Sequence, residues 1–279
     1  MTTGGGRPTG GNGNATTGGN APVGGAATGG TPSATGGKAT GGSPAATGGS
    51  NGGATVPRLT NGKDGTTTRY WDCCKPSCGW KANAAQNGKQ PTRSCGSDGS
   101  AVVGVDTQSA CSGGSAYQCY SFAPWSVSST LSYGYAATGG GNGNCGKCFQ
   151  LDFTGTGDNA GASALSSKTM IVQAINIGGD VASTQFDLLI PGGGVGAFNA
   201  CSNQWGTTNL GAQYGGFLTS CNYTNTSCVE DYCTKVFGSK PTLLAGCQWF
   251  TGWFSAASNP KIKYAEVACP SEITSKSGM

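Results

Sequence analysis

The distribution of cysteine constrains this chain more than any other feature. All 14 cysteines lie between Cys73 and Cys269, and the even number is compatible with complete pairing. Metal binding is the alternative use of so many thiols, but only Cys145 and Cys148 have Cys-x-x-Cys spacing and the chain contains no histidine. We therefore expect a disulfide framework, which forms in an oxidising, extracellular compartment.

The segment before the cysteines has a different composition. Residues 1–64 contain no cysteine and no aromatic residue, and Thr-Gly-Gly recurs at 9–11, 17–19, 28–30, 35–37, 40–42 and 47–49. Such a segment cannot bury enough apolar surface to offset the entropy lost on ordering. We expect a disordered linker over 1–64 and one folded domain over 65–279. A linker joins two modules, and the sequence leaves open whether Met1 is the natural start.

The folded domain has the pattern of a β-rich protein. Short segments with strand character are separated by Gly, Asn, Ser and Pro, and sustained helical periodicity is absent. A compact barrel or sandwich is the default architecture for such a pattern. The expected strands are 129–137, 148–155, 168–177, 247–254 and 261–269.

Several kinds of chemistry are excluded by residues that the sequence lacks. Without histidine there is no Ser-His-Asp or Cys-His catalytic unit, and paired cysteines are not nucleophiles. The glycine run 192–196 is not followed by Gly-Lys-Ser/Thr and predicts a tight turn. A net charge of +4 is too small to indicate nucleic acid, and no apolar run has the length of a membrane span. Carboxylate chemistry remains.

Three of the 12 acidic residues stand out. Asp72 lies between Trp71 and two cysteines, Asp187 lies between Phe186 and an apolar run, and Asp180 follows an expected strand. Apolar surroundings raise the pKa of a carboxyl group and suit a general acid, whereas a better solvated carboxylate serves as a base. Two carboxylates in different environments are the usual minimum for glycoside hydrolysis. The alternative is that these aspartates cap turns.

Two long motifs resemble those of a known family. They are TRYWDCCKPSCGW at 68–80 and GGDVASTQFDLLIPGGGVGAFNAC at 178–201. Both are similar to signatures of the fungal-type endoglucanases of glycoside hydrolase family 45, and the likeness runs from about residue 66 to residue 271. The resemblance implies an all-β, six-stranded double-psi β-barrel with long disulfide-rich loops and an open groove.

The same resemblance implies a function. It is that of a secreted endo-β-1,4-glucanase, a cellulase that cleaves internal bonds of cellulose or a related glucan with inversion and needs no cofactor or metal. The implied protein is a monomer without nucleic-acid or membrane partners. We expect the module joined by the linker to bind cellulose.

Residue roles follow from the motif positions. Asp72 corresponds to the general base, Asp187 to the general acid and Asp180 to an assisting carboxylate on a mobile loop. For inversion, the base and acid should stand roughly 6.5–9.5 Å apart, with room for a water. The implied substrate-binding residues are Tyr70, beside the scissile sugar, Trp80, which stacks on a glucosyl unit, and Thr68, Lys75, Ala137 and Tyr214.

The chain departs from the family pattern in two respects. Gln185 stands where many relatives carry histidine, two positions before the acid, which leaves the pH optimum open. Cys228 and Cys233 are additional. The implied disulfides are Cys73–Cys201, Cys74–Cys111, Cys78–Cys145, Cys95–Cys119, Cys148–Cys269 and Cys221–Cys247, which leaves Cys228–Cys233 as the seventh pair.

Two non-catalytic interpretations stay open. An expansin-like wall-loosening protein shares the barrel and an equivalent of the acid but usually lacks the base, so Asp72 argues against it. A barwin-type carbohydrate-binding module uses the same barrel without catalysis.

Asn222 and Asn225 begin Asn-x-Ser/Thr tripeptides compatible with secretion, and their glycosylation is left open.

Overall fold

The computed structural model describes residues 55–279. The expected linker therefore lies outside the described residues as far as residue 54. Hydrogen bonds to the barrel begin soon afterwards: the Pro57 carbonyl accepts from Gln150, and Arg58 donates to the Phe153 carbonyl. Pro57 and Arg58 thus contact the folded domain, although the sequence analysis placed them in the linker.

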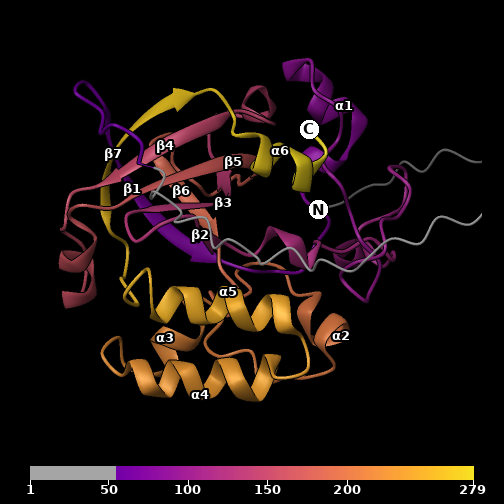
Figure 1. Cartoon of the computed structure of the whole chain (residues 1–279). Coiled ribbons are helices and arrows are strands. Elements are labelled where there is room, and N and C mark those ends of the chain that lie inside the picture. Colours follow the sequence, from indigo (N-terminus) through magenta and orange to yellow (C-terminus); the bar gives the residue numbers. More distant parts are fainter. Residues whose placement is uncertain (1–54) are drawn as a thin grey trace, which may run out of the picture. The chain divides into compact units, whose positions relative to one another are not determined.

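A closed β-barrel forms the centre of the described chain (Figure 1). The order around it is β3-β5-β4-β7-β1-β6, and a further pairing of β6 with β3 closes the ring, while β2 extends β3. The β1–β6 and β3–β5 pairs are parallel, and the remaining pairs are antiparallel. The expected all-β six-stranded fold is confirmed. The strands are β1 Lys63–Tyr70, β2 Trp125–Ser126, β3 Leu131–Thr138, β4 Cys148–Phe153, β5 Thr169–Ile177, β6 Gln185–Leu189 and β7 Lys261–Val267.

Four of the five expected strands correspond to β3, β4, β5 and β7. The expected strand at 247–254 is wrong, because most of it belongs to helix α5, Pro241–Thr251. Pro241 is the first residue of that helix. Its missing backbone N–H loses no hydrogen bond there, because an N–H at this position has no acceptor within the helix. The buried Leu243, Cys247 and Phe250 then recur at helical spacing. The cluster of aromatic residues had suggested a strand.

Helices α4 and α5 lie side by side, with α5 between α4 and the strands of the barrel (Figure 1). The Asn225 side chain caps α4 by accepting the Cys228 N–H at 3.0 Å. The helices are α1 Lys81–Ala84, α2 Cys201–Trp205, α3 Gly216–Ser220, α4 Thr226–Phe237, α5 Pro241–Thr251 and α6 Ser271–Ser277. Short 3-10 turns occupy Ser77–Gly79, Ala85–Asn87, Ala110–Ser112, Tyr120–Phe122, Asn142–Asn144 and Ala160–Leu165.

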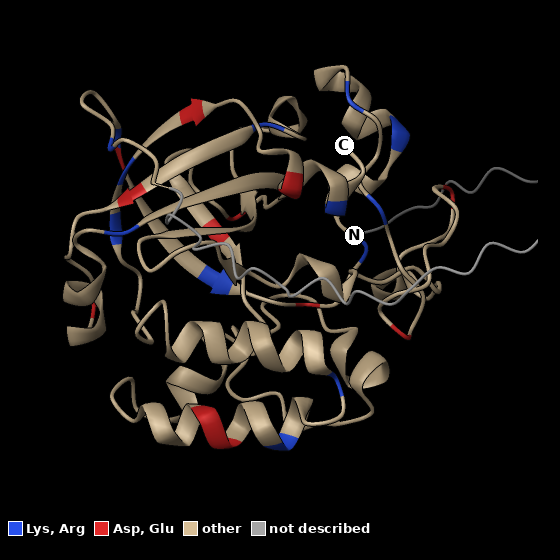
Figure 2. Cartoon of the chain, in the orientation of Figure 1, with Lys and Arg blue, Asp and Glu red and all other residues tan. Residues whose placement is uncertain are grey.

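Charged side chains contribute little to holding this fold together. Figure 2 shows basic and acidic residues interspersed along the described ribbon. The ion pairs found there, such as Lys81–Asp106 and Lys263–Asp64, are largely exposed, and exposed pairs contribute about 0–1 kcal/mol each. Within residues 55–279, no helix has the length and apolar character needed to cross a bilayer.

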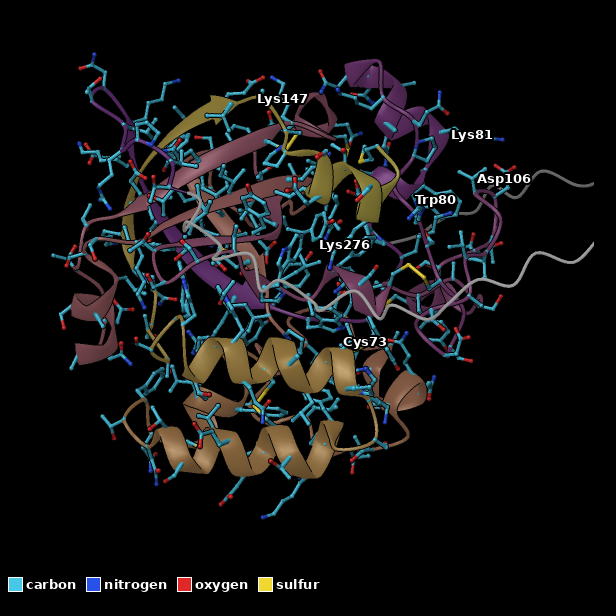
Figure 3. All side chains as sticks on the ribbon, viewed as in Figure 1. Cys73, Trp80, Lys81, Asp106, Lys147 and Lys276 are labelled. Carbon is cyan, nitrogen blue, oxygen red and sulfur yellow. A yellow bond between two sulfur atoms is a disulfide. The ribbon has the colours of Figure 1, made fainter. Side chains whose placement is uncertain are left out.

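Seven disulfides supply much of the constraint, and some of their sulfur bonds are visible in Figure 3. Each bridge contributes about 2–4 kcal/mol by restricting the unfolded chain. Five of them join pairs that the family resemblance implies: Cys73–Cys201, Cys74–Cys111, Cys78–Cys145, Cys95–Cys119 and Cys148–Cys269.

The other two expected pairs are wrong. The structure joins Cys221 to Cys228 and Cys233 to Cys247, in place of Cys221–Cys247 and Cys228–Cys233. Cys228 and Cys233 both lie on α4, five residues apart. Five residues advance a helix by about 7.5 Å and turn it through about 140°, so these side chains diverge too far for a bridge. The error came from not expecting a helix there.

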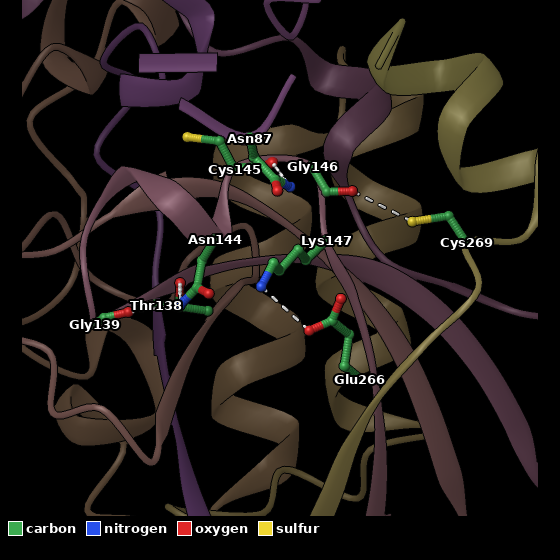
Figure 4. Close-up of polar contacts among 9 residues, drawn as sticks. All are labelled: Asn87, Thr138, Gly139, Asn144, Cys145, Gly146, Lys147, Glu266 and Cys269. Atoms are coloured by element: carbon green, nitrogen blue, oxygen red, sulfur yellow. Dashed lines mark hydrogen bonds and ion pairs between the residues drawn. The ribbon is translucent and has the colours of Figure 1, made fainter. Parts of the chain in front are cut away.

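The loop between β3 and β4 shows how bridges and hydrogen bonds combine (Figure 4). Asn87 donates to the Cys145 carbonyl at 2.9 Å, and Asn144 donates to the Gly139 carbonyl at 2.9 Å. Lys147 pairs with Glu266 of β7 at 3.3 Å. Cys145 and Cys148 both lie at the β4 end of this loop and are bridged to distant segments, so that end of the loop is fixed.

Candidate active site

The two sequence motifs meet at one cleft of ≈ 360 Å³. A second cleft of ≈ 290 Å³ adjoins it and shares Asp180, Val181 and Asp187. Of the candidate residues, the first cleft is lined by Asp72, Asp180, Asp187, Tyr70, Lys75, Trp80 and Ala137. Thr68 and Tyr214 line the second cleft together with Asp180 and Asp187.

Asp187 lies on β6, between two neighbouring strands. Its register partners are Thr68 on β1 and Ala137 on β3. The Thr68 hydroxyl is 2.6 Å from Asp187 Oδ1, and the Gln185 amide donates to the same hydroxyl at 2.9 Å. Because the amide occupies a lone pair of the Thr68 oxygen, the hydroxyl proton is directed at the carboxyl group. Gln185 therefore acts on the acid through Thr68.

The environment of Asp187 favours its protonated form. Burial, together with the negative charges of Asp180 and Asp72, raises the pKa of Asp187 to about 7. The hydrogen bond from Thr68 and the charge of Arg69 oppose that rise in the pKa. A carboxyl group with this balance holds a proton near neutral pH, as a general acid must.

Asp72 lies two residues after the last residue of β1. Its Oδ1 accepts the Cys74 N–H at 2.9 Å, and its carbonyl accepts the Ala200 N–H at 2.9 Å. Cys73 adopts a positive φ of 63°, and its disulfide to Cys201 holds it in that conformation. Burial raises the pKa of Asp72 to about 6, while the Cys74 hydrogen bond lowers it.

Tyr70 is buried near both carboxyl groups. Its hydroxyl accepts a hydrogen bond from Asn176 at 2.9 Å, and Asn176 Oδ1 accepts the Ser77 N–H at 2.8 Å. Burial, Asp72 and Asp187 raise the pKa of Tyr70 well above its usual range, so the phenol keeps its proton. Asn176, which the sequence analysis missed, therefore fixes the position of a hydrogen-bond donor in the cleft.

Lys75 supports Trp80. Its ammonium lies 3.3 Å from the centroid of the Trp80 ring and donates to the carbonyls of Val105 and Thr107. Lys81 pairs with Asp106 in the same loop at 3.1 Å; Figure 3 labels these two residues and Trp80. One face of the indole is therefore held by a cation, which fixes the ring at the cleft.

The remaining site residues are more exposed. Asp180 lies in the segment between β5 and β6, after two glycines. Tyr214 is 63% exposed, and Phe198, which sequence reasoning also missed, is 62% exposed and lines the first cleft. In residues 55–279, no group of three or more His, Cys, Asp and Glu side chains is placed to hold a metal ion.

Comparison with known proteins identifies the family. The family model described as glycosyl hydrolase family 45 matches residues 64–279. "Endoglucanase B" of Cellvibrio japonicus is 52% identical over 243 residues, which cover 81% of this chain and 47% of that protein. An "Endoglucanase" of Cryptopygus antarcticus is 40% identical over 227 residues, covering 78% of this chain and 89% of that one.

A solved structure agrees with the sequence matches. The crystal structure of the cellulase from the Antarctic springtail Cryptopygus antarcticus aligns with a TM-score of 0.65 and 41% identity, covering 79% of this chain and 97% of that one. This chain spans most of the springtail protein but only about half of the Cellvibrio relative. With both motifs at one cleft and a family model that matches most of the sequence, the chain belongs to glycosyl hydrolase family 45.

Proposed function

We propose that the chain is an endo-β-1,4-glucanase that cleaves internal glucosidic bonds with inversion. The observation that carries this proposal is that two buried carboxyl groups, Asp72 and Asp187, line one cleft, and burial raises the pKa of both. Pairs of this kind divide the roles of base and acid between them. The family membership and the printed names of the relatives support the same activity.

The proposed reaction uses each carboxyl group once. Protonated Asp187 transfers its proton to the glucosidic oxygen as the bond from that oxygen to C1 breaks. Ionised Asp72 accepts a proton from a water that attacks C1 from the opposite face. The product is the α-anomer, and exchange of protons with solvent restores the starting states of both aspartates.

The other cleft residues position the substrate in this proposal. Tyr70 donates its phenolic proton to the sugar at the scissile bond, and Trp80 presents the ring face not held by Lys75 to a glucosyl unit. Ala137 leaves room beside the acid because its side chain is only a methyl group. The charge of Asp180 helps to keep Asp187 protonated.

The setting of the protein is part of the same proposal. All cysteines of the described chain are paired, which fits an extracellular, secreted enzyme. We infer that it acts as a monomer on a β-1,4-glucan and that the linker joined it to a cellulose-binding module. The partial coverage of the Cellvibrio relative is compatible with such a larger protein.

The experiment that tests the function is proton NMR of a cello-oligosaccharide during digestion by the whole chain. We expect the α-anomer to appear before mutarotation equilibrates the products. An early β-anomer would mean retention and would refute the roles of Asp72 and Asp187. Binding without any hydrolysis would favour the expansin-like alternative.

The pH dependence of kcat/KM should be bell-shaped. Activity should fall below about pH 6 as Asp72 is protonated and above about pH 7 as Asp187 ionises. The measurement is kcat/KM for a cello-oligosaccharide at constant ionic strength, from about pH 4 to about pH 9. A profile that stays flat up to the alkaline end would contradict the assignment of the acid.

Replacing Thr68 by valine should move the alkaline limb of that profile to higher pH. The substitution removes the hydrogen bond that stabilises the Asp187 carboxylate, so the pKa of the acid rises. Asp180→Asn is the matched variant, because removing that negative charge lowers the pKa of Asp187 and moves the limb to lower pH. Shifts of the same sign in both variants would contradict this account.

A further inference from the structure

The second cleft extends the site on one side only. It contains Asp180 and Asp187 but not Asp72. In the proposed reaction, the sugar that is attacked lies between both carboxyl groups, whereas the leaving sugar extends from the acid and away from the base. The cleft that contains only the acid therefore lies on the leaving-group side.

A short disulfide-closed loop forms part of this cleft. The bridge between Cys221 and Cys228 spans seven positions, and Tyr223 within it lines the cleft. Asn222 and Tyr223 have φ angles of 57° and 62°, a conformation that an aromatic residue rarely adopts. Tyr223 N–H donates to the Leu218 carbonyl at 2.9 Å, and Asn159 donates to the Tyr223 carbonyl at 2.9 Å. The loop thus holds the Tyr223 backbone in an unfavourable conformation.

Exposed aromatic side chains concentrate at the two clefts. Of the large apolar or aromatic residues that are exposed in the described chain, the aromatic ones are Phe198, Tyr214 and Tyr223, and each lines one of the clefts. Tyr223 is 44% exposed and Tyr214 is 63% exposed. Aromatic faces left in contact with water are suited to stacking on the apolar faces of pyranose rings.

The polar groups of the second cleft fit the same ligand. The Thr219 hydroxyl has no hydrogen-bond partner in the described chain although it is buried. Arg69 donates to the Gly215 carbonyl at 3.0 and 3.2 Å, which fixes the residue next to Tyr214. These contacts hold the backbone beside Tyr214 in place.

We propose that Tyr223, together with Tyr214, binds glucosyl units of the β-1,4-glucan on the leaving-group side of the scissile bond. The loop closed by Cys221 and Cys228 makes Tyr223 a residue that determines specificity for chain length. This inference rests on the proposed function. It predicts that a long substrate depends on Tyr223 more than a short one does.

The test compares Tyr223→Ala with the wild type on cellohexaose and on a nitrophenyl cellotrioside, whose leaving group is a single aryl ring. We expect Tyr223→Ala to lose about tenfold in kcat/KM for cellohexaose, as is typical when an aromatic stacking partner is removed. The factor by which Tyr223→Ala lowers kcat/KM for the aryl substrate should be at least about fivefold smaller than the factor for cellohexaose. The reason is that the aryl leaving group is too short to span the cleft. Tyr223→Phe, which keeps the ring, should resemble the wild type.

Val102→Ala is the matched control, because Val102 is 60% exposed and lies outside both clefts. Equal losses of Tyr223→Ala on the two substrates would mean a structural role and would overturn the inference, as would no loss on either. Calorimetric binding of cellohexaose to Asp187→Asn, in which hydrolysis is suppressed, provides a readout that does not need hydrolysis, and adding Tyr223→Ala should weaken that binding about tenfold. If the wild type binds cellohexaose, with this dependence on Tyr223, but hydrolyses neither substrate, the proposed function fails and the binding site stands.

Discussion

Replacing Asp187 by asparagine should lower kcat on cello-oligosaccharides by about a hundredfold or more, the contribution of a positioned general acid. Asparagine has nearly the same shape and accepts the Thr68 hydrogen bond, but it has no proton to give to the leaving oxygen. A substrate with a dinitrophenolate leaving group needs no such proton. The kcat of Asp187→Asn on that substrate should therefore fall much less. The measurement is kcat for both substrates in wild type and variant.

Two controls separate loss of the acid from loss of the fold. Asp64→Asn changes a carboxylate that is 84% exposed and pairs with Lys263, and it should leave kcat unchanged. Burial raises the pKa of Asp187 above its unfolded value, so the wild type loses stability as the pH rises through about 7 and the carboxylate ionises. The Tm of Asp187→Asn should therefore fall less than that of the wild type between pH 5 and pH 8. Equal kcat losses on both substrates would contradict the role of Asp187.

The sequence motifs were sufficient to find the carboxyl groups but not their supports. Thr68 and Asp187 are 119 positions apart, Gln185 and Thr68 are 117 apart, and Tyr70 and Asn176 are 106 apart. These contacts exist only because β1, β5 and β6 are brought together as the barrel closes. No local pattern of residues encodes such register, so the effect of Gln185 on the acid through Thr68 could not be foreseen.

Local patterns were also misleading in the region from Cys221 to Phe254. Trp249 and Phe250 are buried aromatic residues of the kind that favours strands, yet both lie on α5, which packs against α4. Two bridges, Cys221–Cys228 and Cys233–Cys247, then replaced the two expected pairs. Burial against a neighbouring helix overrode the intrinsic preference of the residues, and the strand and disulfide predictions failed together.

Replacing Asp72 by asparagine should also lower kcat by about a hundredfold or more, because no group then removes the proton from the attacking water. The local backbone conformation should survive, since the asparagine oxygen still accepts the Cys74 N–H and the disulfides of Cys73 and Cys74 are unchanged. The acidic limb of the pH profile near pH 6 should disappear with the carboxyl group that causes it. The measurement is kcat and kcat/KM across the same pH range as for the wild type.

Azide distinguishes the two aspartates by their chemistry. Azide is an anion that attacks C1 without losing a proton, so it should restore turnover to Asp72→Asn and yield an α-glycosyl azide, while Asp187 still protonates the leaving oxygen. Asp187→Asn keeps its base, and azide supplies no proton, so its activity on cello-oligosaccharides should not recover. Rescue of Asp187→Asn in place of Asp72→Asn would exchange the assignments, and a β-glycosyl azide from Asp72→Asn would contradict attack from the side of Asp72. The position of Asp72 in the same cleft as Asp187, held by the Cys74 hydrogen bond, is the structural reason to expect rescue of the base variant only.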